Sequence, residues 1–136
     1  MALELNGTTG VSLIQDGVVV SADLNSALSD TIGKVKAWVN FDGTTNTGGS
    51  CDIRASYNVS SVTDHGTGDY SINFTTAMVD AAYSASSLCG LSGGLYSRRY
   101  ASALSWSTSA LRINVFYVDG GTTRYDAPYV TTTIFR

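Results

Sequence analysis

Hydrophobic and polar residues alternate with a period of two along most of the chain after residue 33. This period is typical of a β-strand that buries one face in a core and exposes the other face to water. The segment Lys34–Phe41 shows the pattern well, because every second residue from Val35 onward is apolar. Trp38 falls on the opposite face, among polar residues. We therefore predict a strand here, with Trp38 pointing outward.

The same alternation predicts six further strands, which turn-forming residues separate. The turns are a loop that opens at Asp42-Gly43, a tight connection at Asp64–Gly68 and a hairpin turn at Asp119–Gly121. Strands at this spacing predict an all-β fold, a single antiparallel β-sandwich of jelly-roll-like form. The predicted strands are Ile53–Val59, Asp69–Thr76, Ala82–Cys89, Leu104–Ser107, Leu111–Val118 and Tyr129–Phe135. The predicted core consists of Val35, Val39, Ile53, Tyr70, Ile72, Phe74, Ile113, Val115 and Phe135.

The first 33 residues follow a different pattern. Leu3–Val20 reads as two short extended pieces interrupted by glycines, and Ser21–Asp30 is compatible with one or two helical turns. This segment is too short to enclose a core, so we predict an extended N-terminal arm over 1–33 and a sandwich domain over 34–136. We expect the arm either to pack on a neighbouring subunit or to form an edge hairpin of the same sheet. The predicted assembly interface is Leu3, Leu5, Val11, Leu13, Ile14, Leu24, Leu28 and Trp38.

Composition and charge narrow the functional classes. A chain of 136 residues with 43% hydrophobic and 14% charged residues is compatible with one folded domain and argues against intrinsic disorder. The net charge of -3 and the absence of a basic stripe argue against nucleic-acid binding. No export signal or membrane-spanning stretch is visible, so we expect synthesis in the cytoplasm without membrane insertion. Cys51 and Cys89 are then expected to be free thiols.

The residues that could perform chemistry do not form a recognisable catalytic or metal-binding pattern. His65 is the only histidine, and it has no second ligand at zinc-site spacing and no serine in a nucleophile elbow. Most aspartates occupy turns or strand ends, where their side chains bond the local backbone. Asp64 and Asp69 offer oxygen ligands for calcium, but nothing resembles an EF-hand. We therefore predict no catalytic residues, no metal and no cofactor.

Aromatic residues are the more informative group. The chain has eight Tyr, four Phe and two Trp, and many of these must fill the core, as the alternation around Tyr70 indicates. Tyr and Trp combine an apolar ring with a hydrogen-bonding group, which suits contact with sugar rings or partner proteins. Two loop-like segments pair them with arginine. They supply the predicted binding surface, Tyr96, Arg98, Arg99, Tyr100, Arg124 and Tyr125.

Seven stretches of the chain form a recognisable set: Leu3–Val11, Gln15–Gly17, Lys36–Thr44, Ser56–Thr63, Gly66–Tyr70, Asn73–Met78 and Ile134–Arg136. Together they resemble the short modules found at the ends of bacteriophage tail fibres and in other minor phage structural proteins. The resemblance covers nearly the whole chain. It implies an all-β, trimeric virion protein with no cofactor and no catalytic residues. Such fibres carry a long stalk before the module, whereas here the module starts close to Met1, which favours a short knob or a capsid-decorating protein.

Three functions follow from these patterns. The first is a non-enzymatic virion module for attachment to a host cell-surface glycan or protein, supported by the aromatic and arginine residues in loops. The second is capsid decoration, in which homotrimers stabilise the shell and contact other virion proteins through the arm. The third is a glycan-binding or glycan-cleaving module, which lacks a convincing acid/base pair of carboxylates. We expect the first.

Overall fold

The computed structural model describes residues 34–91, 98–118 and 122–136, and every regular element in these ranges is a β-strand. Residues 33–136 form one unit by their contacts, and the predicted arm lies outside the described residues. The all-β expectation is therefore confirmed. The strands are β1 (Val35–Thr47), β2 (Ser50–Tyr57), β3 (Val59–Asp64), β4 (Asp69–Phe74), β5 (Ser84–Gly90), β6 (Arg99–Trp106), β7 (Ala110–Val118), β8 (Thr122–Arg124) and β9 (Tyr129–Phe135).

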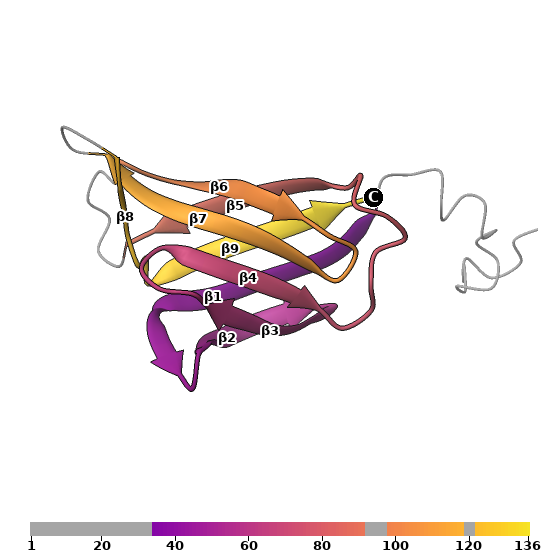
Figure 1. Cartoon of the computed structure of the whole chain (residues 1–136), viewed down its shortest axis with the longest axis horizontal. Coiled ribbons are helices and arrows are strands. Elements are labelled where there is room, and N and C mark those ends of the chain that lie inside the picture. Colours follow the sequence, from indigo (N-terminus) through magenta and orange to yellow (C-terminus); the bar gives the residue numbers. More distant parts are fainter. Residues whose placement is uncertain (1–33, 92–97, 119–121) are drawn as a thin grey trace, which may run out of the picture. The chain divides into compact units, whose positions relative to one another are not determined.

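All strand pairs are antiparallel, and they form one sheet with the order β5-β9-β1-β2-β3-β4-β7-β6, with β8 added beside β7. Strands β1 to β4 are neighbours in chain order and form an antiparallel meander. The two strands at the ends of this order, β5 and β6, contact each other and run side by side in Figure 1. The sheet thus curls until it is nearly closed into a barrel-like form, which leaves few unpaired strand edges.

The pairing of β2 with β3 is short, because these strands share a single register pair, Ser50 with Thr63. The chain reverses between these strands at Asn58, whose φ of 54° is in the left-handed region that asparagine tolerates better than most residues. The Asn58 side chain donates to the carbonyls of Lys36 and Thr76 and accepts from the Thr76 N–H. The prediction of one continuous strand over Ile53–Val59 was therefore wrong, and β3 was missed.

The first strand is longer than predicted. It continues through Asp42-Gly43 to Thr47, with irregular register against β2, so the predicted loop at this position was wrong. Gly43 is needed for packing, because a Cβ there would lie 2.6 Å from the Tyr70 hydroxyl oxygen. The reversal occurs instead at Gly48 and Gly49, both with positive φ. β6 also begins five residues before the predicted start at Leu104, and β8 was not predicted.

The barrel interior is lined by residues that alternate along each strand. Six of the predicted core residues are buried: Val39, Tyr70, Ile72, Phe74, Ile113 and Val115. Ile53 is partly buried, but Val35 is 42% exposed and Phe135 is 38% exposed, so these two predictions were wrong. On β9 the buried residues are Val130, Thr132 and Ile134, which places Phe135 on the outer face.

Val35 is the register partner of Phe135, and a register shift separates it from the buried Ala37. This irregularity turns Val35 outward together with Phe135, since residues directly opposite each other in an antiparallel pair share a face. Thr132 is polar but points inward. The hydrophobic pattern of β9 therefore does not show which of its residues face the core.

Both cysteines are free, as predicted. Cys51 on β2 is buried and Cys89 on β5 is half-buried. Burial raises the pKa of the Cys51 thiol to about 12, and nearby aspartates, Asp64 first among them, add to this shift. Burial also raises the pKa of Cys89. Both thiols behave as small core residues and not as nucleophiles.

Candidate functional site

A group of polar and aromatic side chains occupies the outer surface of β4, β6, β7 and β8. On β4, Asp69 and Ser71 alternate with the buried, inward residues Tyr70 and Ile72. Their register partners on β7 are Asn114 and Arg112, and Phe116 on the same face of β7 pairs with Arg124 on β8 and Tyr100 on β6. We call this set the arginine face: Asp69, Ser71, Tyr100, Arg112, Asn114, Phe116 and Arg124.

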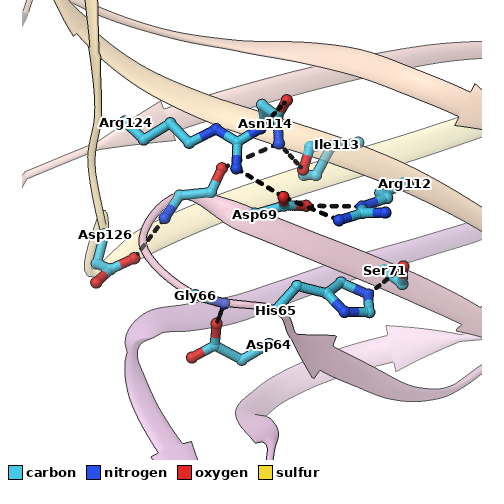
Figure 2. Close-up of polar contacts among 11 residues, drawn as sticks. Asp64, His65, Gly66, Asp69, Ser71, Arg112, Ile113, Asn114, Arg124 and Asp126 are labelled. Carbon is cyan, nitrogen blue, oxygen red and sulfur yellow. Dashed lines mark hydrogen bonds and ion pairs between the residues drawn. The ribbon is translucent and has the colours of Figure 1, made fainter.

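Asp69 lies at the centre of this face and is shared by two arginines (Figure 2). Arg112 donates from Nε to Asp69 Oδ1 at 2.8 Å and from Nη2 to Oδ2 at 3.0 Å, a bidentate geometry. Arg124 donates from Nη1 to Oδ2 at 2.8 Å and from Nη2 to the Asn114 amide oxygen at 3.4 Å. The Asp69 side chain is only 5% exposed, whereas those of Arg112 and Arg124 are 39% and 47% exposed.

The electrostatics of the cluster follow from this geometry. The hydrogen bonds from Arg112 hold the pKa of the Asp69 carboxyl below its usual value, and the charges of Arg112, Arg124 and His65 act in the same direction against the opposing effect of burial. The same contact raises the pKa of Arg112. One ionised carboxylate thus faces two guanidinium groups, so these three side chains together carry more positive than negative charge.

The turn before β4 positions Asp69 and its neighbours. Gly68 has a φ of 62° and packs so tightly that a Cβ would lie 2.4 Å from the Val115 carbonyl oxygen. Its carbonyl accepts from the Val115 N–H, and its own N–H donates to the Asp126 carboxylate at 2.7 Å. Asp126 also lies 2.7 Å from the Tyr70 hydroxyl. The predicted tight connection at Asp64–Gly68 is therefore confirmed, and it holds β4 against β7.

The aromatic part of the arginine face lies on β6 and β7. The Tyr100 and Phe116 rings are stacked, with centroids 5.1 Å apart, and Tyr100 is 43% exposed. Since Arg124 is the register partner of Phe116, the exposed tyrosine ring and the arginine pair lie on one continuous outer surface. Of the predicted binding residues, Tyr100 and Arg124 are the two that the fold brings onto this face.

The other predicted binding residues lie elsewhere. Arg99 and Tyr125 are half-buried: the Arg99 guanidinium carbon lies 4.3 Å from the centroid of the Tyr125 ring and 4.9 Å from that of Tyr117. Tyr125 packs against the core, so Arg99 and Tyr125 point toward the interior, contrary to their prediction as surface residues. Arg98 is exposed, and its carbonyl accepts from the Val118 N–H. Tyr96 lies outside the described residues.

Sequence reasoning missed Asp69, Ser71, Arg112 and Asn114 as members of a site. Asp69 was considered only as the first residue of a strand and as an oxygen ligand for calcium, and Arg112 occupies a strand that was judged only by its apolar residues. Polar residues at alternate positions of β4 and β7 were the available signal. This signal could not be used without knowing the register of β4 against β7, because that pairing decides which polar residues lie next to each other.

A second surface lies on β1, β2 and β9. Trp38 is the register partner of Tyr57, and Val35 is that of Phe135. All four are exposed large hydrophobic residues, and Trp38 points outward as predicted. We call this set, Val35, Trp38, Tyr57 and Phe135, the apolar face. The other predicted assembly residues, Leu3, Leu5, Val11, Leu13, Ile14, Leu24 and Leu28, lie outside the described residues.

His65 and Ser71 form a contact that the sequence did not indicate. His65 Nε2 lies 2.8 Å from Ser71 Oγ across the β3–β4 turn. The nearby carboxylate, Asp69, is engaged by both arginines and does not orient the imidazole as a triad requires. Within the described ranges, no group of three or more His, Cys, Asp or Glu side chains could hold a metal ion. The same ranges contain no helix that could cross a membrane.

Comparisons with known proteins add no assignment. A scan against protein-family models, a search of curated proteins and a search of solved structures each returned no match to this chain.

Proposed function

We propose that this protein is a non-enzymatic attachment module of a bacteriophage particle, made in the host cytoplasm and displayed on the virion, whose arginine face contacts a ligand on the host cell surface. The observation that carries the proposal is the pair of half-exposed arginines, Arg112 and Arg124, held on one buried carboxylate beside the exposed Tyr100 ring. The sequence resemblance to tail-fibre modules supports the placement on a virion.

The arrangement suits binding better than it suits structural stabilisation alone. Arg124 is 47% exposed, and an ion pair with so exposed a partner contributes little to stability, roughly 0–1 kcal/mol. A second arginine on a carboxylate that already has a bidentate partner adds positive charge that the carboxylate does not neutralise. Rigid, oriented guanidinium groups beside an aromatic ring are typical of recognition surfaces, where arginine and tyrosine supply much of the binding energy.

The carboxylate of this face is unsuited to general-acid catalysis, which supports the non-enzymatic form of the proposal. Two guanidinium groups stabilise the ionised form of Asp69 and occupy both of its oxygens. A general acid needs a raised pKa, and the shift here is downward.

Cell binding tests the proposal. The purified, fluorescently labelled protein is mixed with a panel of intact Gram-negative and Gram-positive bacteria, and adhesion is measured by flow cytometry. We expect saturable adhesion to at least one species and its loss in the double variant Arg112→Gln/Arg124→Gln. Arg54→Gln is the matched control, because Arg54 is an arginine that also pairs with an aspartate, Asp42, but lies on β2, which is separated from β7 by β3 and β4. Equal adhesion of all three proteins, or adhesion to none of the panel, would contradict the proposal.

A second candidate function is capsid decoration by a homotrimer, and the apolar face favours it. Trp38, Tyr57 and Phe135 expose large rings on one surface, which is a feature of protein–protein contacts. In this function the apolar face contacts a second copy or another virion protein. Immunogold labelling of particles distinguishes the two candidates, since attachment requires label at the tail and decoration requires label over the shell.

A further inference from the structure

Resting on the proposed function, we propose that the arginine face binds the carboxylate group of an acidic cell-surface sugar, with the Tyr100 ring against the sugar and the serine hydroxyls around Arg112 on its hydroxyl groups. The ligand class is thus an acidic glycan, such as a polyuronate or a polysialate, and not a neutral one.

The first argument is the supply of unused donors. Arg112 contacts Asp69 through Nε and Nη2, and among the described residues its Nη1 group has no hydrogen-bond partner. Arg124 contacts the same carboxylate through Nη1 and Asn114 through Nη2, which leaves Nε without a partner in the same part of the chain. Both side chains are more than one-third exposed. A carboxylate suits such a pair of partly exposed guanidinium groups, because it accepts hydrogen bonds from N–H donors and carries the complementary charge.

The second argument is that the guanidinium groups are already oriented. An arginine on a protein surface normally loses side-chain entropy when it binds a ligand, and this loss weakens binding. Asp69 is buried and fixed between β4 and β7, and its contacts hold Arg112 and Arg124 before any ligand arrives. Asp69 therefore acts as a positioning residue that lowers the entropic cost of binding.

The third argument is the chemistry of the surrounding surface. Ser105 on β6 and Ser71 on β4 are the register partners of Arg112, one on each side of it. Ser102 on β6 is the partner of Asn114. Hydroxyl groups both donate and accept, as sugar hydroxyls require. Tyr100 is the register partner of Phe116, which lies two residues after Asn114 on β7. Its exposed ring offers an apolar face for the C–H groups of a pyranose ring.

A matched set of polysaccharides tests the charge requirement. Binding of the full-length protein to polygalacturonate, to its fully methyl-esterified form and to polysialate is measured by biolayer interferometry at 150 mM salt. The ester has the same backbone without the carboxylate charge. We expect binding to at least one carboxylated polymer and at least ~10-fold weaker binding to the ester, which corresponds to one charge-assisted contact.

Variants locate the site. Arg112→Gln and Arg124→Gln should each weaken binding ~10-fold, Tyr100→Ala should weaken it several-fold, and Arg54→Gln should leave it unchanged. A thermal melt shows whether the arginine variants remain folded. If they lose stability, Tyr100→Ala still tests the site, because Tyr100 is not part of the ion-pair cluster around Asp69. Dextran sulfate serves as a polyanion without carboxylates. Equal weakening by Arg54→Gln, or equal binding to dextran sulfate, would show nonspecific attraction and overturn the proposal.

The outcome separates this inference from the proposed function. If neither carboxylated polymer binds, but the wild-type protein still adheres to bacteria and the arginine variants do not, the ligand class is wrong and the attachment function stands. If the protein neither binds the polymers nor adheres to cells, both are wrong.

Discussion

The arginine face and the apolar face lie on different walls of one barrel and share the same inward pattern of buried residues. Their first difference is in what the outward positions hold. On β4 and β7, outward residues are charged or polar and are tied together around a buried carboxylate. On β1 and β9, they include large hydrophobic residues that lack a covering layer among the described residues. The inward positions therefore determine the fold, while the outward positions give each wall a different kind of partner.

The two faces also differ in how they depend on the backbone. The arginine face relies on the turn at Gly68, which holds β4 against β7 through bonds to Val115 and Asp126. The apolar face is formed by strand pairs alone, with Val35 turned outward by a register irregularity. We expect the arginine face to be sensitive to changes far from its ligand contacts, and the apolar face to tolerate them.

The largest expected effect comes from Gly68→Ala. The new Cβ would meet the Val115 carbonyl oxygen at 2.4 Å and the backbone would be strained at a φ of 62°, so we expect a loss of about 3 kcal/mol in the free energy of unfolding. Gly48→Ala is the matched control, because Gly48 has the same φ of 62° but nothing within 4 Å. It should cost about 1 kcal/mol. Urea denaturation measures both, and equal losses would contradict the packing role of Gly68.

The next effect concerns Asp69→Asn. Removal of the buried charge from its two arginines should lower the free energy of unfolding by about 2 kcal/mol at pH 7. The pKa of Asp69 is lower in the folded state than in the unfolded state, so its contribution is present above the unfolded pKa and is lost as the pH falls through the folded value. The gap between wild type and variant should therefore close in acid.

Denaturation at several pH values below 7 checks this dependence. Asp52→Asn, at an exposed position on β2, is the control and should leave the stability nearly unchanged. A gap that stays constant from pH 7 to strongly acidic solution would mean that the Asp69 charge does not stabilise the fold.

A smaller effect on stability, with a separate effect on assembly, is expected for Trp38→Ser. The residue is 38% exposed, so we expect a loss of about 1 kcal/mol. If the apolar face forms the trimer contact, light scattering should show a trimer for the wild type and a smaller species for the variant. Tyr100→Ser removes an aromatic residue of similar exposure from the other face and should leave the oligomeric state unchanged. A monomeric wild type would remove the basis for the trimer.

The smallest effect is expected from reduction. Both thiols are free, and their raised pKa values disfavour the reactive thiolate. A reductant should therefore leave the melting temperature unchanged, and alkylation at pH 8 should be slow until the protein unfolds. A fall on the order of ten degrees with reductant would indicate a covalent bridge instead, given the ~2–4 kcal/mol typical of one.

The sequence alone was sufficient for the fold class, for six of the nine residues predicted to lie in the core and for the outward position of Trp38. Alternation of hydrophobic residues is a local property, and it depends only on the pleat of a strand. It failed where the pleat is interrupted, at the left-handed Asn58 and at the register shift beside Val35, and where a polar residue points inward, at Thr132.

The arginine face was decided by the tertiary structure. Asp69 is separated by 43 residues from Arg112 and by 55 from Arg124, so no local pattern relates them. Their meeting depends on the register of β4 with β7 and on the pairing of β8, and a shift of one residue would send the same side chains to the opposite face. The same register sent Arg99 and Tyr125 inward although their neighbours Tyr100 and Arg124 point outward. Sequence proximity identified the right segments, and strand pairing selected which of their side chains reach solvent.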